Sequence, residues 1–159
     1  MLGITTSLDA ARREARGAVE DLAGEVRRLG ERHAADHDVH HMSRTLGLLL
    51  DEAAAGLGAG REPDAEREGG RFARVREAAS KAMGSRPPAG ALLLADLRRF
   101  LASASDASVA CVVLAQGAQA ARNRDLLEAV TVAHDAVLRT HRWALTRLKV
   151  TAPQVLLGP

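Results

Sequence analysis

Apolar residues recur every three or four positions along the first third of the chain, with charged residues between them. From residue 8 to residue 33 this spacing places the following side chains on one face of a helix: Leu8, Ala11, Ala15, Val19, Leu22, Val26 and Leu29. An apolar stripe opposite a charged face is typical of an amphipathic helix. We expect a helix over residues 7–32, with a stop and reversal at Gly30 and the polar residues after it. A second helix over residues 38–57 repeats the pattern, so the two should form an antiparallel hairpin.

The pattern breaks between residues 58 and 90. Pro63, Pro87 and Pro88 exclude one continuous helix there, because proline lacks the amide hydrogen that a helix needs and its ring clashes with the preceding turn. We interpret this segment as a long crossover that carries one short helix near residues 71–82.

Two long helices are predicted in the second half of the chain. The third covers residues 89–122, and the fourth covers residues 124–150 with Asn123 as its N-cap. Pro153 should end the fourth helix, which leaves residues 151–159 as an extended tail over the bundle. No segment shows the two-residue alternation of a β-strand.

The chain is therefore predicted to be one all-α domain over residues 1–159, a four-helix bundle of two antiparallel hairpins joined by the crossover. A length of 159 residues suits a single domain with its own core. The positions that we expect to be buried are Leu22, Val26, Leu46, Leu49, Leu97, Leu101, Cys111, Leu114, Val130, Val137 and Leu148.

The charge balance argues against nucleic-acid binding. The chain has 22 basic and 20 acidic side chains, interspersed, and a net charge of only +2. A protein that binds a nucleic-acid groove gathers its basic residues on one face, and one that binds single strands also needs aromatic side chains for stacking. The large aromatics are only Phe72, Phe100 and Trp143. We expect no nucleic-acid partner.

The cysteine content and the N-terminus bear on the compartment. Cys111 is the only cysteine, which excludes an internal disulfide and a cysteine-based zinc site. Its apolar neighbours favour a buried, unreactive thiol. Residues 1–10 lack the pattern of a signal peptide, and no stretch approaches the roughly 20 apolar residues of a membrane span. We expect a cytoplasmic protein with no membrane partner.

The densest polar signal is the stretch ERHAADHDVHH, which holds four of the six histidines: His33, His37, His40 and His41. Imidazoles bind zinc, copper, nickel or iron, and His37 and His41, four residues apart on a helix, could chelate one ion. If the segment is a turn, His33 could still converge with His41 across the hairpin. The alternative, which we prefer, is a solvated polar turn in which Asp36 or Asp38 caps the second helix.

A second candidate site lies on the third and fourth helices. His134 and His141 share a side of the fourth helix with its leucines, where they could ligate haem or a metal. The alternative is a hydrogen bond to the third helix, at Ser103, Ser105 or Asp106. Asp106 fits least well with a purely structural role, because it interrupts the small-residue run ASASDASVA.

The helix order, the segment DEAAAGL at the end of the second helix, and the segment LAQGAQAARNRDLLEAV between the third and fourth resemble the ferritin-like four-helix-bundle family, in particular bacterial ferritin-like stress-associated proteins. The resemblance covers nearly the whole chain and implies a ferritin-like fold. In that family two metals are held by a Glu from each of two helices and a Glu-x-x-His from each of the others. Here Glu20 and Asp106 lie at about the right depth, but the second and fourth helices carry no Glu-x-x-His.

Three functions remain open. We prefer a non-enzymatic ferritin-like protein that acts by binding or assembly, without an intact di-iron site, and whose partner is a second copy or another protein. The second is a metal- or haem-binding protein that uses the histidines. The third is a receptor for a small ligand in an apolar cavity near Cys111. No cofactor is expected under the first hypothesis, and no motif of a hydrolase or nucleotidase occurs.

Overall fold

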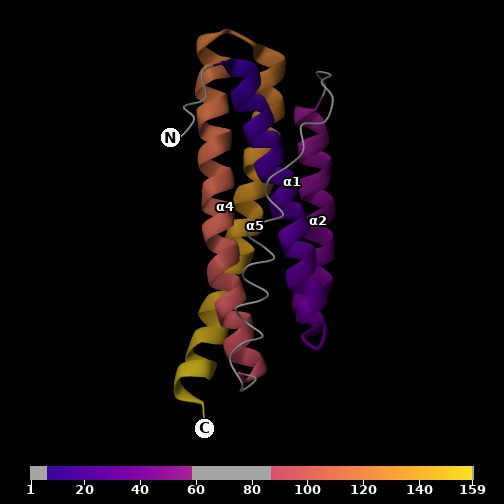
Figure 1. Ribbon diagram of the computed structural model, residues 1–159, viewed down its shortest axis with the longest axis vertical. Helices are drawn as coiled ribbons and strands as arrows, with labels where there is room; N and C mark the ends of the chain where they lie inside the picture. Colours follow the sequence, from indigo (N-terminus) through magenta and orange to yellow (C-terminus); the bar gives the residue numbers. More distant parts are fainter. Residues whose placement is uncertain (1–6, 59–86, 159) are drawn as a thin grey trace.

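The computed structural model describes residues 7–58 and 87–158, and these residues form helices and short turns with no strand. The short helix predicted near 71–82 lies outside the described residues. The helices are α1 (Leu8–Arg32), α2 (His37–Leu57), α4 (Ala89–Ala120) and α5 (Arg124–Leu157) (Figure 1). The predicted all-α four-helix bundle is thus confirmed for this part of the chain.

Short polar side chains cap the N-termini of three of the four helices in the described part of the chain. The Oγ of Ser7 accepts a hydrogen bond from the amide of Ala10, and a carboxylate oxygen of Asp36 accepts one from the amide of Val39. The side chain of Asn123 caps α5 in the same way, as predicted. Each cap satisfies an amide that has no partner inside its helix. In α4, Pro88 takes the N-cap position without a side-chain hydrogen bond.

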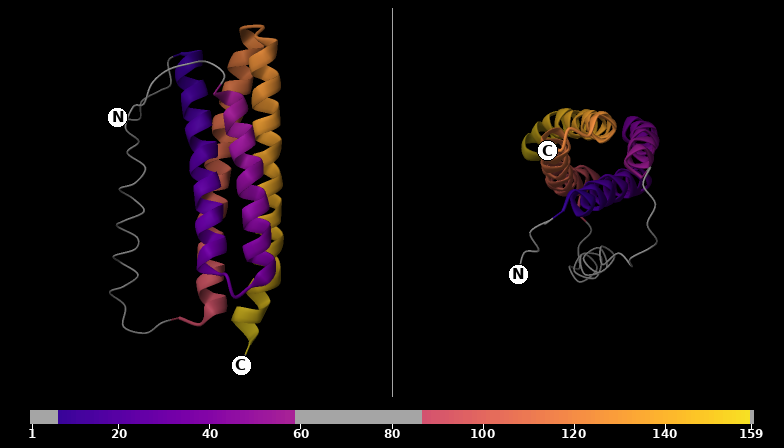
Figure 2. Two further views of the ribbon diagram at one scale, coloured as in Figure 1. Left: turned by 90° about the vertical axis from the view of Figure 1, so that its right-hand side faces the viewer. Right: turned by 90° about the horizontal axis from the view of Figure 1, so that it is seen from above.

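The four helices surround one core, and each packs against two neighbours (Figure 2). The large interfaces are α1 with α2, α4 with α5, α1 with α4, and α2 with α5. Helices α1 and α5 run in one direction and α2 and α4 in the other, so all these neighbours are antiparallel (Figures 1 and 2). Consequently α2 ends at the opposite end of the bundle from the one where α4 begins.

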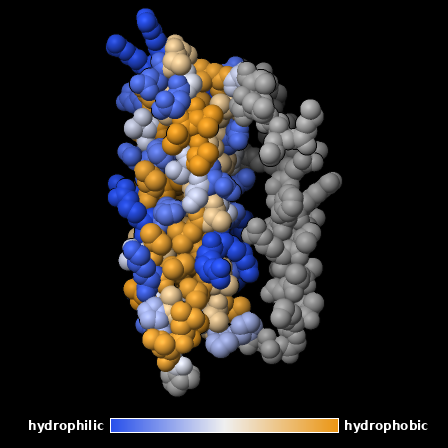
Figure 3. Space-filling model, turned by 90° about the vertical axis from the view of Figure 1, so that its left-hand side faces the viewer, coloured by the Kyte–Doolittle hydropathy of each residue, from blue (hydrophilic) through white to orange (hydrophobic). Residues whose placement is uncertain are grey.

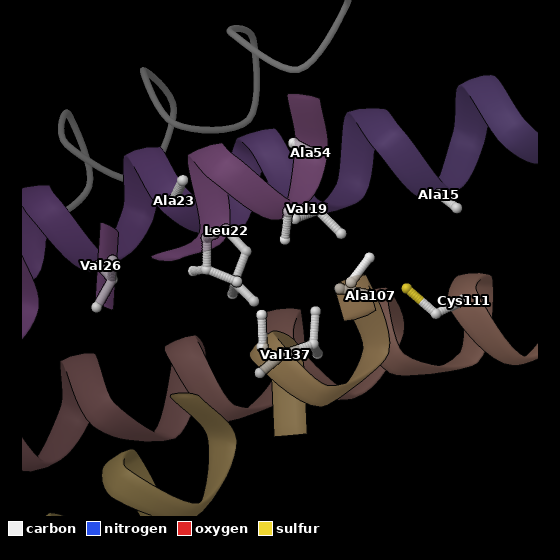
Figure 4. Close-up of a cluster of buried hydrophobic side chains, with 14 of the residues drawn as sticks. Ala15, Val19, Leu22, Ala23, Val26, Ala54, Ala107, Cys111 and Val137 are labelled. Carbon is white, nitrogen blue, oxygen red and sulfur yellow. The ribbon is translucent and has the colours of Figure 1, made fainter. Parts of the chain in front are cut away.

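The core consists of small and medium apolar side chains drawn from all four helices. Figure 4 shows Val19 and Leu22 of α1 facing Ala107 of α4 and Val137 of α5. Most of the predicted core positions are buried. The exceptions, which are partly buried and pack against the core, are Leu49, Leu101 and Leu148.

The extended tail predicted for residues 151–159 is wrong, because α5 continues to Leu157 with Pro153 inside it. A proline removes its own amide hydrogen bond and strains one turn, but it leaves the following turns free to form. Thr151, two residues before the proline, is buried and its hydroxyl donates to the carbonyl of Arg147. Val155 lies against Gly90 of α4. Tertiary contacts on both sides of the proline therefore hold the helix together.

The first helix ends at Arg32, as predicted, and Gly30 lies inside it. The glycine is buried where α1 meets α2, and a Cβ placed on it would lie 2.6 Å from the Cβ of Ser43. That distance is too short for two carbon atoms. The sequence signal of this glycine thus reflects a close contact between helices and not a helix end.

Candidate functional site

The structure separates the histidines of the first turn. His33 is buried, and its Nε2 donates a hydrogen bond to Asp96 of α4 at 2.8 Å. His40 directs its Nδ1 toward the carbonyl oxygen of Gly30 at 3.1 Å. Each of these two imidazoles has one ring nitrogen occupied by a partner in the bundle.

His37 and His41 lie on the outer face of α2 and are exposed. Their rings stack with centroids 6.4 Å apart, because residues four apart on a helix are neighbours. His33 faces α4 instead, so the structure does not bring His33, His37 and His41 to one point. Among the described residues, no group of three His, Cys, Asp or Glu side chains is placed to hold a metal ion. Asp36 caps α2, as the polar-turn interpretation expects.

Asp96 is a residue that the sequence analysis missed. Besides His33, its carboxylate accepts hydrogen bonds from Arg32 at 2.9 Å and from Arg99 at 3.3 Å. The signal was available, since Asp96 stands in the apolar stripe of α4 three residues after Leu93. Both oxygens of this buried carboxylate therefore have hydrogen-bond partners, which makes Asp96 a polar link between α1 and α4.

A second ionic link ties α5 to the same turn. Arg147 donates to the carboxylate of Asp36, and its guanidinium lies 4.0 Å from a carboxylate oxygen of Asp38. Burial raises the pKa of Asp36, but the hydrogen bonds from the amide of Val39 and from Arg147 outweigh this effect and hold that pKa below 3.8. The polar residues at this end of the bundle thus fix the turn to α4 and α5.

The second candidate site is also dispersed. His134 is partly buried and its Nε2 lies 2.8 Å from the Oγ of Ser108, so its partner is on α4 but is not one of the three expected residues. His141 is partly buried on α5. Asp106 is exposed on the side of α4 that faces α1, away from both histidines. The structure therefore does not assemble His134, His141 and Asp106 into one binding site.

Cys111 is fully buried among apolar side chains. Burial raises the pKa of its thiol from 9.0 to about 11, because the thiolate would lose its hydration. The prediction of a buried thiol is confirmed. A thiol in this state is a poor nucleophile and a poor metal ligand at neutral pH.

An open depression of about 250 Å³ lies between α1 and α4. Its polar lining includes Asp21 and Glu25 of α1 and Ser103 and Asp106 of α4. It is open and acidic, whereas the small-ligand hypothesis requires an enclosed apolar cavity. It also lies beside Ala107 rather than at Cys111.

The solvent side of α4 carries a group of exposed valines. We call it the α4 outer face and define it by the residues Ala91, Ala95, Arg98, Ala102, Ser105, Val109, Val112, Val113 and Gln116. Ala91 and Ala95 are partly buried, and the other seven are exposed. Val109 is 62% exposed, Val112 43% and Val113 52%. Figure 3, which looks onto the side of the bundle that α4 occupies, shows hydrophobic side chains in a band along the molecule.

Helix α4 has more apolar side chains than it buries in the core. From residue 101 to residue 120 the helix carries a single charge, Asp106. By length and composition alone, α4 is apolar enough to cross a membrane, but the core helix of a soluble bundle meets the same criterion. Only 28% of the most apolar 18-residue stretch of α4 is buried. Exposed valines in a group mark an interaction surface more often than isolated apolar residues do.

No protein-family model matches this chain, and neither a curated protein nor a solved structure matches it.

Proposed function

We propose that the chain is a non-enzymatic helical-bundle protein, ferritin-like in topology and without an intact di-iron site, that acts by binding or assembly through the α4 outer face. The observation that carries the proposal is the exposure of Val109, Val112 and Val113 on the part of α4 from residue 101 to residue 120, whose single charge is Asp106. Such side chains gain about 25 cal/mol for each Å² of apolar surface that a partner removes from water.

The helix arrangement supports the ferritin-like part of the proposal. Two antiparallel hairpins whose neighbours are all antiparallel, with α2 and α4 parallel across the diagonal, agree with a bundle that has one long crossover. The centre of this bundle is filled by apolar side chains such as Leu22 and Val137 where a di-iron protein places carboxylates. Glu52 and Glu128 are exposed. The absence of a group of three His, Cys, Asp or Glu side chains placed to hold a metal ion in the described part of the chain supports the same proposal.

A metal- or haem-binding role for the histidines has no comparable support. Calorimetric titration of tag-free protein with zinc, copper and nickel tests it directly. We expect no tight binding, because His33 is bonded to Asp96 and only His37 and His41 remain on one face. Tight binding to the wild type that is lost in His37→Ala would favour the metal site over the present proposal.

The proposed interface can be tested without knowing the partner. A photo-reactive phenylalanine analogue replaces Val109 in one variant and Leu48 of α2 in the other, and both are produced in cells. Leu48 is a matched control, since it is 68% exposed but stands alone on the outer face of its helix. We expect discrete cross-linked products from position 109 and few from position 48. Absence of products at position 109, or equal products at both positions, would overturn the proposed role of the α4 outer face.

A further inference from the structure

The α4 outer face has a pattern that identifies its partner. We infer that the occupant is a second copy of this chain, packed antiparallel against α4 about a two-fold axis beside Ala102. This inference rests on the proposed function, since it names the partner of the same face.

Most side chains in the N-terminal half of the face are small. Ala91, Ala95, Ala102 and Ser105 follow one another at spacings of three, four and seven residues, so they form one row along the helix. Small residues in such a row allow the backbones of two helices to approach closely. The larger Val109 and Val113 continue the row in the C-terminal half.

Antiparallel packing makes these two halves complementary. When the two-fold axis lies beside Ala102, two residues face each other across the interface if their numbers add up to about 204 or 205. Val109 then lies over Ala95 of the second copy, and Val113 lies over Ala91. Large side chains meet small ones at both ends, as in a well-packed helix interface. Because the interface is two-fold symmetric, each contact occurs twice.

The charged side chains beside the face are also complementary between two copies. Arg99 and Asp106 are exposed and flank the face on the edge that is nearer α1. Asp106 lines the depression between α4 and α1. Arg99 contacts Asp96, which also accepts a hydrogen bond from Arg32 of α1. A two-fold axis brings the same edges of two antiparallel helices together. The numbers 99 and 106 sum to 205, so the register that fits the apolar row also places Asp106 opposite Arg99 of the second copy, twice.

The same charges argue against a membrane as the occupant. Arg98, Arg99 and Asp106 lie around the middle of α4, at the depth where a spanning or inserted helix would meet hydrocarbon. Charged side chains at that depth are costly unless they are paired. A second copy gives Asp106 a partner, and a lipid surface does not.

Sedimentation equilibrium of the full chain tests the inference. One copy has a mass of 16.8 kDa, and we expect a dimer of twice that mass, about 34 kDa. Ala102→Glu places two carboxylates beside the axis and should weaken the dimer roughly tenfold or more. Ala55→Glu is the matched control, since Ala55 is also an exposed helical alanine but lies on α2, and it should leave the dimer unchanged. Circular dichroism checks that both variants are folded.

Charge reversal tests the register. Asp106→Arg alone should weaken the dimer several-fold, because it places a second guanidinium opposite that of Arg99 in the other copy. Adding Arg99→Asp should restore the dissociation constant to within about threefold of the wild type, as expected for residues that contact each other. If the losses of dimerisation free energy caused by Asp106→Arg and by Arg99→Asp simply add in the double variant, the proposed register is wrong.

The outcomes separate the two proposals. A wild-type monomer whose position 109 cross-links to a different protein overturns the second copy but retains the proposed function. A monomer with no cross-link from position 109 overturns both. A monomer that floats with anionic lipid vesicles through Val109 and Val113 assigns the face to a membrane and overturns the second copy.

Discussion

Whether a residue of this bundle tolerates substitution depends on the atoms that lie next to it. Gly17 and Gly30 illustrate the difference within one helix. A Cβ on Gly17 would meet no atom within 4 Å, whereas a Cβ on Gly30 would overlap the side chain of Ser43. Asp96 and Asp51 differ in the same way, since the first is a buried carboxylate with three partners and the second forms an exposed pair with Arg27.

Substitution of the two glycines by alanine should have opposite effects. Gly30→Ala forces α1 away from α2 and should lower the free energy of unfolding by about 1–3 kcal/mol. Gly17→Ala improves helix propensity without a clash and should raise it by up to about 1 kcal/mol. Urea denaturation followed by circular dichroism measures both. A stabilising Gly30→Ala would mean that the helices do not approach as closely as described.

Asp96→Asn should be among the costliest isosteric changes in the protein. It leaves Arg32 and Arg99 without their counter-charge and His33 facing a neutral amide, which should lower the free energy of unfolding by about 3 kcal/mol. The control Asp51→Asn breaks an exposed ion pair and should cost less than about 1 kcal/mol. Equal effects in thermal or urea denaturation would contradict a linking role for Asp96.

Cys111 should make the stability of the bundle sensitive to alkaline pH. Its pKa rises from 9.0 in the unfolded chain to about 11 in the folded one, so the unfolded state loses its thiol proton first as the pH increases. The stability contribution is complete below pH 9 and is lost by about pH 11, a change of roughly 3 kcal/mol at 1.36 kcal/mol per pKa unit. Urea unfolding across this range should show the decline in the wild type and a smaller decline in Cys111→Ala.

At the scale of elements, the helix ends depend on a few local conformations. Between α4 and α5, Arg122 adopts a left-handed conformation with φ of 54°, while the amides of Arg122 and Asn123 bond back to carbonyls of the last turn of α4. This is a Schellman motif, in which glycine normally takes the left-handed position. Asn123 then caps α5, so the reversal of the chain is complete within three residues.

Arg122→Gly should therefore stabilise the protein. Glycine adopts the left-handed conformation without the steric cost that a Cβ imposes, and we expect a gain of up to about 1 kcal/mol in the free energy of unfolding. Arg122→Ala keeps the Cβ and should give no comparable gain. Denaturation of both variants measures the difference, and equal stabilities would indicate that the side chain of Arg122 and not its backbone decides the turn.

For the whole molecule, the proposed assembly links stability to protein concentration. If the α4 outer face is covered by a second copy, unfolding requires dissociation. A tenfold increase in concentration should then stabilise the folded dimer by about 1.4 kcal/mol and raise the midpoint of thermal unfolding by a few degrees. In Ala102→Glu the midpoint should be independent of concentration. A concentration-independent midpoint in the wild type as well would contradict a dimer in which folding and association are coupled.

The sequence by itself determined the helices and most of the core, because both follow from local spacing. Apolar residues at intervals of three and four define a helix and its buried face together, so positions such as Leu22 and Val137 are identifiable before any tertiary contact is known. Capping follows equally local rules, as Asn123 demonstrates. The sequence of α4 also indicates that some of its apolar side chains are exposed, since the helix has more apolar residues than one buried stripe can hold.

Tertiary structure alone decided which polar groups meet and where α5 ends. His33 and Asp96 lie 63 residues apart in the chain, so no local pattern shows that they meet or that this contact separates His33 from the other histidines. Gly30 and Pro153 have strong local preferences, but the approach of α2 and the contacts beyond the proline override them. Local preferences are worth about 1 to 3 kcal/mol per residue, and packing between helices can exceed that.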